Sequence, residues 1–263
     1  MNITTAITRM EDLGDSLAQT GDARRHFHQV YLRTTRVVAD EIRAGRFLAP
    51  EWVERWDVLF ADLYLDALED SLSGRTPSRP WAVAFSAAEQ QPLLPPLRHV
   101  LFGMNAHINF DLPQALLGVI SSEEFADEPL RQRREQDHLQ IDRVLLDRVS
   151  AEDDELAAQG PRSLLDRLLA PLNRLGTKRF LTEARRKVWQ NTIELDRARQ
   201  QSDDVYRDRL AQLEAVSAGR VSDLAAPGQV LLKLAVRGFG VRLAATDASA
   251  ARGQASQPER RTR

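Results

Sequence analysis

Apolar residues recur at helical spacing over most of the chain. They fall three or four residues apart in Thr4–Ala18, Asp22–Ala44 and Pro50–Leu72. Such spacing places the apolar side chains on one face of an α-helix. Runs that alternate apolar and polar residues around a hairpin dipeptide are missing, so we expect no β-sheet.

Proline, glycine and capping residues divide this pattern into separate helices. Asp22 is the expected N-cap of the second helix, and Gly45 is expected to end it. Thr177 is expected to cap one long helix that continues through at least Leu213. Other helices are expected at Trp81–Gln91, Leu97–Ile120, from Ser121 onward, Leu130–Val149 and Ser163–Leu172. The predicted fold class is therefore all-α.

We expect a single multi-helix domain over residues 1–245. The chain has 263 residues, of which 43% are hydrophobic, and this is enough for a sizeable core. From about Thr246 the sequence is small, polar and basic. Such a composition cannot bury enough apolar surface to fold, so residues 246–263 are predicted to be a disordered tail.

One predicted helix, Leu97–Ile120, departs from the pattern of a surface helix. Lys, Arg and Glu are absent from Val100 to Ile120. A helix exposed to solvent on one side normally carries such residues on that side. We therefore expect this helix to be central, buried and surrounded by the others.

Four short polar residues lie within this central helix. His107 and Asp111 are four residues apart and share one face, whereas Asn105 and Asn109 form a second row roughly opposite. Pro113 lacks the N–H that would bond to the carbonyl of Asn109, so we expect a kink there. Burying so many polar groups costs stability unless function requires them. The four residues are therefore the candidate catalytic groups, and simple structural pairing remains the alternative.

Asp62 and Asp66 are candidate partners for His107 and Asp111. Two carboxylates four residues apart repel each other unless a cation lies between them. Oxygen and imidazole ligands bind divalent metals, so these four residues form a candidate metal site. We expect Asp62 or Asp66 to approach the central pair across a helix interface, although a solvated face would also explain both aspartates.

Five further residues are candidates for substrate binding. Asp137 and His138 lie in a second acidic and histidine-containing segment, and an aspartate follows His138 at the spacing seen in the central helix. Arg186 and Trp189 lie in a basic and aromatic stretch, where Arg186 is placed to meet an anionic substrate. Tyr64 lies between the two aspartates of the candidate metal site. Packing or a salt-bridged surface is the alternative for each of them.

Composition narrows the possible partners and compartments. The net charge of −2, from 36 basic and 38 acidic residues, gives no overall field that would attract nucleic acid. There is no cysteine, which excludes disulfides, thiolate metal sites and a cysteine nucleophile. No apolar run reaches the roughly 20 residues of a membrane span. Met1–Gly14 lacks the apolar stretch of a signal peptide, so we expect a cytoplasmic protein. The expected partner is a small-molecule substrate.

The block Gly103–Leu112, Gly-Met-Asn-Ala-His-Ile-Asn-Phe-Asp-Leu, resembles a family of uncharacterised helical proteins common in actinobacteria. The segments Ala44–Phe47, Pro50–Arg55, Phe60–Ala67, Asp137–Asp142 and Ala184–Trp189 carry the same resemblance, which extends over about Phe27–Ala198. This family is a domain of unknown function. The resemblance implies one helical domain and supplies no reaction. The block is also locally similar to the helical zinc-dependent phospholipase C, but this chain has only five histidines, too few to transfer that trinuclear site.

Three functions remain open from the sequence. The first is an enzyme with an Asp- and His-lined helical pocket, using a divalent metal to activate water or to hold a phosphorylated substrate in a hydrolase-like reaction. The second is a metal-free cyclase or isomerase of secondary metabolism that uses an aspartate as general acid. The third is a non-enzymatic binding or scaffold protein. Walker, Gly-x-Ser-x-Gly and His-Glu-x-x-His motifs are all missing, which excludes most common enzyme classes.

Overall fold

All regular structure in the computed structural model is helical over the residues that it describes, 2–141, 174–228 and 230–244. The helices up to the central segment are α1 (Ile3–Thr20), α2 (Arg25–Arg43), α3 (Pro50–Leu72) and α4 (Arg79–Gln90). They are followed by α5 (Pro96–Ala106), the π-helix η1 (His107–Asp111), α6 (Leu112–Val119) and α7 (Ser122–Ala126). Residues 128–141 are also helical. The last helices are α10 (Arg174–Arg199), α11 (Asp203–Ala225) and α12 (Val230–Arg237). The all-α prediction is confirmed.

Local chemistry sets most helix boundaries. Pro50 and Pro96 are the first residues of α3 and α5, where a missing N–H costs nothing. Gly21 adopts a left-handed conformation, with φ of 68°, and ends α1. Ser121 forms a capping box with Glu124 at the start of α7. Helix α3 runs from Pro50 to Leu72, which confirms the boundaries predicted for it.

Three boundary predictions are wrong. Thr177 does not cap α10, because α10 already includes Arg174. Asp22 is not the N-cap of α2, which begins after Arg24; the Asp22 carboxylate instead accepts a hydrogen bond from the Arg24 N–H at 2.8 Å. The single long helix expected to extend through Leu213 is two helices, α10 and α11. The Ser202 hydroxyl accepts a hydrogen bond from the Val205 N–H and thereby caps a new helix.

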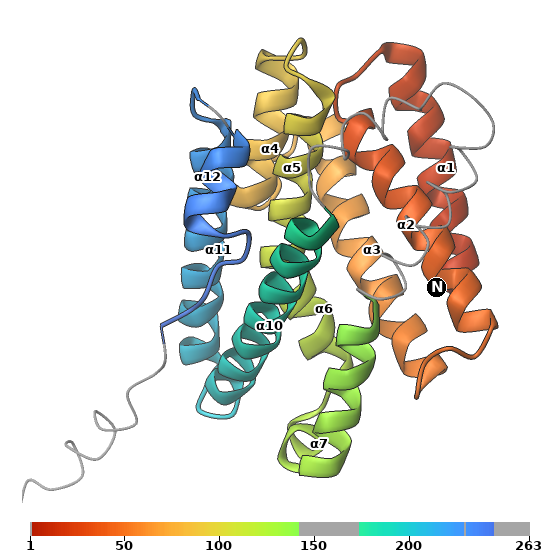
Figure 1. The fold of residues 1–263 in the computed structure, drawn as a ribbon, viewed down its shortest axis with the longest axis vertical. Helices are drawn as coiled ribbons and strands as arrows, with labels where there is room; N and C mark the ends of the chain where they lie inside the picture. Colours follow the sequence, from red (N-terminus) through yellow and green to blue (C-terminus); the bar gives the residue numbers. More distant parts are fainter. Residues whose placement is uncertain (1, 142–173, 229, 245–263) are drawn as a thin grey trace, which may run out of the picture.

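The central segment, which consists of α5, η1 and α6, lies between two flanks of helices (Figure 1). Helices α1 and α2 form one flank, α10 and α11 form the other, and α3, α5 and α6 lie between them. The four polar side chains of the central segment are no more than 2% exposed: Asn105, His107, Asn109 and Asp111. The prediction of a buried polar helix is confirmed.

The central segment widens into a π-helix where a kink was expected. The Leu112 N–H bonds to the His107 carbonyl, five residues earlier, which adds one residue to the turn. Pro113 lies two residues beyond η1 and has no N–H to continue the ordinary pattern. The proline thus marks the disturbed turn, and η1 is followed directly by α6.

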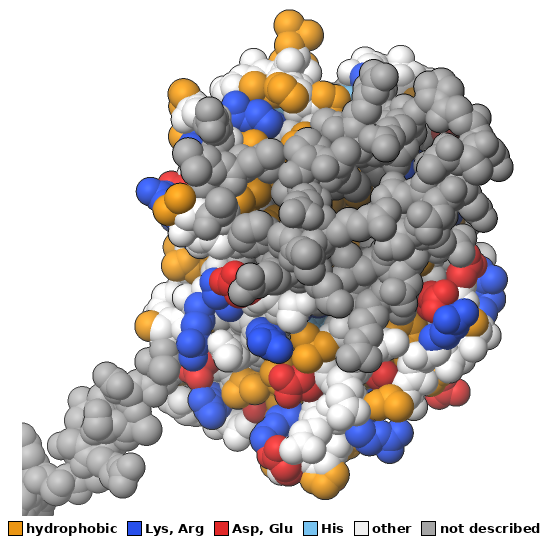
Figure 2. Space-filling view, viewed as in Figure 1, with side chains coloured by type: hydrophobic (Ala, Val, Ile, Leu, Met, Phe, Trp, Pro, Cys, Tyr) orange, Lys and Arg blue, Asp and Glu red, His pale blue; other side chains and the backbone are white. Residues whose placement is uncertain are grey.

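The surface of the described residues carries mixed charge. On the face shown in Figure 2, blue and red side chains are interspersed wherever the described residues are visible. None of the helices in the described ranges is long and apolar enough to cross a membrane. Several expectations lie outside the described residues, namely the helix beyond residue 141, the helix at Ser163–Leu172 and the tail 246–263.

Candidate functional site

Asp111 joins His107 to a tryptophan from a neighbouring helix. Its Oδ2 atom lies 2.8 Å from Nε1 of Trp81, on α4, and 2.9 Å from Nδ1 of His107. The indole N–H can only donate, and Oδ2 has a lone pair for each contact. This network assigns the imidazole proton to Nδ1. The other ring nitrogen, Nε2, is then a hydrogen-bond acceptor.

Aromatic rings surround the imidazole of His107. The Phe60 ring stacks on it with centroids 3.5 Å apart and planes 3° apart. The Tyr31 ring meets it edge-on at 4.4 Å. Three more rings lie within 5.9 Å of it, those of Phe27, Tyr64 and Trp81. The imidazole of His107 is therefore enclosed by aromatic rings from α2, α3 and α4.

Burial favours the uncharged forms of this pair. Desolvation raises the pKa of Asp111 well above its ordinary value. Desolvation also lowers the pKa of His107 well below its ordinary value, and the charge of Arg185 adds to this effect. Because both directions disfavour charge, the pair carries no net charge near neutral pH. Burial raises the pKa of Tyr31 as well, so its hydroxyl keeps its proton.

Three buried polar atoms near the pair have no hydrogen-bond partner among the described residues. They are Nε2 of His107, the hydroxyl oxygen of Tyr31 and Oδ2 of Asp57. Desolvation raises the pKa of Asp57 to about 7, although the charge of Arg185 opposes the rise. Buried polar atoms are nearly always paired, so the unpaired Nε2 of His107 marks a place where a bound molecule would find a partner.

Asp62 and Asp66 do not reach His107, and the expected four-residue metal site is wrong. Both carboxylates bind Arg9 of α1, at 3.2 and 2.8 Å. Their side chains are 29% and 67% exposed, whereas those of the central pair are 3% exposed. No group of three or more His, Asp or Glu residues in the described ranges could hold a metal ion. The guanidinium of Arg9 supplies the positive charge that two aspartates at this spacing require.

Asn105 and Asn109 face away from His107, as expected. Asn109 Nδ2 donates to Asn105 Oδ1 at 3.1 Å, and Asn105 Nδ2 donates to the Leu101 carbonyl. Asn109 also bonds to the backbone of Phe239 and Val241, near the end of the described chain. These two candidate catalytic residues therefore bind protein backbone.

The candidate substrate-binding residues do not converge. Asp137 accepts hydrogen bonds from the Leu48 and Ala49 N–H groups, at 2.7 and 2.8 Å, and caps α3. His138 bonds to the Arg185 carbonyl and stacks on Trp189 in a separate buried cluster. Arg186 is exposed. Tyr64 lies beside His107, but its hydroxyl is 2.9 Å from Nδ1 of His28.

The family match covers every candidate catalytic, metal-binding and substrate-binding residue named from the sequence. A profile of the family of unknown function DUF5995 matches residues 3–227. The chain belongs to this family. No curated protein and no solved structure matches it. The DUF5995 match confirms the expected helical family of unknown function, includes both helical flanks and ends two residues after α11.

Three residues of this candidate site were not identified from the sequence, namely Tyr31, Asp57 and Trp81. Asp57 had a detectable signature, because it lies on the apolar stripe of α3 that also contains Val53 and Ala61. An acidic residue on such a stripe must be buried, paired or neutral. Nothing in the sequence indicates that Trp81 meets Asp111, since that contact depends on how two helices pack.

Proposed function

We propose that the chain is an enzyme that transfers protons on a small, uncharged carbonyl compound without a metal. The observation that supports this most is the orientation of His107. Its Nδ1 is held by Asp111, Asp111 is held in turn by Trp81, and Nε2 is left unpaired. A histidine held by a carboxylate at one nitrogen and open at the other is the arrangement of a general base with its orienting group.

Each group has a distinct role in this reaction. Nε2 of His107 takes a proton from the carbon next to the substrate carbonyl, and the Tyr31 hydroxyl donates a hydrogen bond to the carbonyl oxygen. The imidazolium then returns the proton to another carbon, and the product is an isomer of the substrate. Asp111 holds the ring through its hydrogen bond to Nδ1.

The surroundings indicate the class of substrate. The walls around His107 are aromatic, so a charged substrate would lose its hydration without gaining a counter-charge. This supports the isomerase alternative over hydrolysis of a phosphorylated compound. His107 is 2% exposed, so entry requires covering rings such as Phe60 and Tyr31 to move.

Deuterium exchange tests the proposal. The folded protein is incubated in D₂O with a panel of neutral ketones and enones, and exchange of their α-hydrogens is followed by NMR. We expect the wild type to accelerate exchange for a subset of the panel, and His107→Gln to lose about 100-fold or more of that rate. The control Arg186→Ala changes an exposed side chain and should retain it.

Complete burial of the pair supports a second interpretation, in which the polar helix is a structural hub of a binding or scaffold protein. The same experiment separates the two. If folded wild-type protein exchanges no member of the panel faster than buffer does, and His107→Gln only lowers the melting temperature, the structural hub is the better account.

A further inference from the structure

Residues 238–244 follow α12 and lie without helical structure against η1, α10 and α11. Alternate side chains face the protein: Phe239, Val241 and Leu243 are 5%, 7% and 3% exposed. Arg242 and Ala244 are exposed. Gly240 is buried as well, so strict alternation holds only over Val241–Ala244, where it is typical of an extended chain with one face buried.

Two asparagines hold the backbone of this segment in the same way. Asn109 donates to the Phe239 carbonyl at 3.2 Å and accepts from the Val241 N–H at 3.1 Å. Asn191, on α10, repeats the contact two residues later. It donates to the Val241 carbonyl at 3.1 Å and accepts from the Leu243 N–H at 2.9 Å. Each side-chain amide thus makes the pair of hydrogen bonds that a backbone residue of an adjacent β-strand would make.

Basic side chains bind three further carbonyls of the segment. Arg220 donates to the Gly238 carbonyl and Lys187 to the Gly240 carbonyl, both at 3.2 Å. Arg209 donates to the Ala244 carbonyl. A groove that recognises backbone through side chains, and holds alternate apolar side chains, works as peptide-binding grooves do.

Gly240 adds a sequence requirement. A Cβ at this position would lie 2.9 Å from the backbone Cα of Ala184, on α10, and backbone cannot move aside as a flexible side chain can. The groove therefore fits the pattern apolar–Gly–apolar–any–apolar, which residues 239–243 satisfy as Phe-Gly-Val-Arg-Leu.

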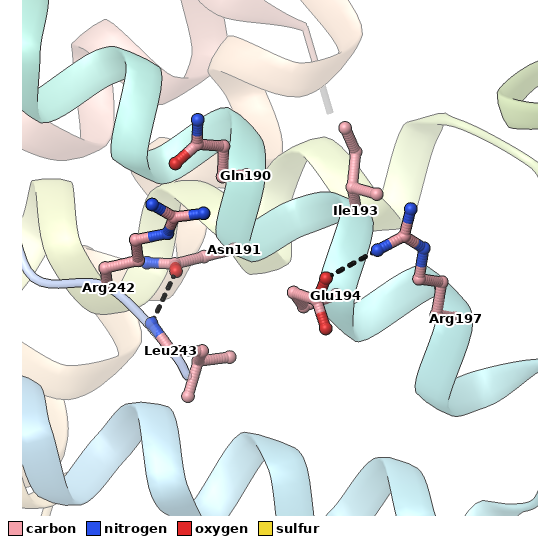
Figure 3. Close-up of a pocket in the computed structure, with 7 residues that line it drawn as sticks. All are labelled: Gln190, Asn191, Ile193, Glu194, Arg197, Arg242 and Leu243. Atoms are coloured by element: carbon pink, nitrogen blue, oxygen red, sulfur yellow. Dashed lines mark hydrogen bonds and ion pairs between the residues drawn. The ribbon is translucent and has the colours of Figure 1, made fainter. Parts of the chain in front are cut away.

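The family match includes the groove residues but not the segment that they bind. The DUF5995 match ends at residue 227, so it includes Asn109 and Asn191 but not the bound segment. Beside the segment, Gln190, Ile193 and Arg197 help to line a pocket of about 180 Å³, together with Arg242 and Leu243 of the segment itself (Figure 3). The groove residues thus lie within the family match, and a pocket remains beside the bound segment.

We propose that this groove is a peptide-binding site and that residues 239–243 occupy it as an intramolecular ligand. The partner that it fits is the same segment of a second copy of the chain. The groove contacts are with backbone atoms and with side chains that a second copy presents identically. Because the chain's own segment is tethered, it competes at an effective concentration of roughly millimolar.

A labelled peptide of residues 237–244, added to the full-length chain, tests the proposal by fluorescence anisotropy. We expect weak binding to the wild type and binding at least about ten-fold tighter to full-length Val241→Asp, whose own segment no longer competes. A peptide with Gly240→Val should not bind, and adding Asn191→Ala to the Val241→Asp chain should abolish binding. Equal binding to both chains, or equal binding of the Gly240→Val peptide, would overturn the proposal.

A second measurement applies if Val241→Asp does not fold. A protease recognition sequence is inserted after Pro227 in the otherwise unchanged chain, and the folded protein is then cut. We expect the C-terminal fragment to stay bound through gel filtration and to be displaced by excess peptide. A fragment that separates at once, or that excess peptide cannot displace, rejects an exchangeable ligand.

Discussion

At the scale of single residues, Gly103 controls how closely α2 approaches the central segment. A Cβ at Gly103 would lie 2.3 Å from Cγ of Phe27, and the Phe27 ring is 5.9 Å from that of His107. Gly103→Ala should therefore push the ring aside and lower the free energy of unfolding by about 1–3 kcal/mol. Urea unfolding measures this loss.

Gly219→Ala is the matched control. Gly219 lies within α11 and a Cβ there meets nothing within 4 Å. Alanine is the better helix former, so this variant should gain about 0.5–1 kcal/mol. Similar changes in the two variants would mean that close packing at Gly103 is not what stabilises the site.

The raised pKa of Asp57 predicts a pH-dependent loss of stability. Burial raises it from 3.8 to about 7, so the folded protein keeps this proton where the unfolded chain has lost it. Stability from this group is therefore complete below about pH 4 and is lost as the pH rises to about 7. The slope is at most about 1.4 kcal/mol per pH unit.

Asp57→Asn removes that titration while keeping the size of the side chain. Urea unfolding of both proteins at several pH values between 4 and 8 gives the difference. Relative to the variant, the wild type should become less stable across this range. Curves that stay parallel would contradict a buried, neutral Asp57.

The residues of the central helix were predictable because their burial is a property of one segment. The absence of long charged side chains from Val100 to Ile120 indicated it directly. The contacts of His107 with Trp81 and Tyr31 were not predictable in this way. They depend on the register in which separate helices pack, which local composition does not encode.

At the scale of helices, Asp137 links two elements far apart in the sequence. Its carboxylate holds the Leu48 and Ala49 N–H groups at the start of α3. Asp137→Ala leaves these donors unsatisfied and should cost about 1–3 kcal/mol, measured as a lower melting temperature. The exposed Asp208→Ala serves as control. Equal melting temperatures would show that water replaces the cap.

Helix boundaries were predicted well where the determinant is a proline or a glycine next to the end. The break between α10 and α11 was missed, although Ser202 followed by Asp203 and Asp204 is a favourable helix start. No apolar residue lies between Ala198 and Val205, so a gap in the apolar spacing marks the break as well. Pro113 correctly marked a disturbed turn, but the choice of a π-helix depends on packing.

At the scale of the whole molecule, the C-terminal segment joins the central helix to α10. Asn191→Ala removes both bonds of that side chain to the segment. We expect amide hydrogen exchange at Leu243, whose N–H loses its acceptor, to accelerate by about ten-fold or more. Gln190→Ala, which changes an exposed neighbour, should not alter it. Unchanged exchange in Asn191→Ala would show that the other contacts of the segment hold it without Asn191.

The sequence predicted the class of the fold but not what each candidate residue does. A polar residue that must be buried was recognised in Asn109 and Asp111 alike. One of them orients an imidazole and the other holds a peptide backbone. The difference depends on residues more than 100 positions away for Asn109, and on a different helix for Asp111.

The state of His107 is the most direct test of the proposed site. The account requires a neutral imidazole with its proton on Nδ1, bound to Asp111, and with Nε2 as a bare acceptor. Nitrogen-15 NMR of labelled protein reports both ring nitrogens across a pH titration. We predict one protonated and one unprotonated nitrogen from about pH 5 to 8, with no titration in that range. An imidazolium that titrates near its ordinary pKa, or a proton on Nε2, would contradict it.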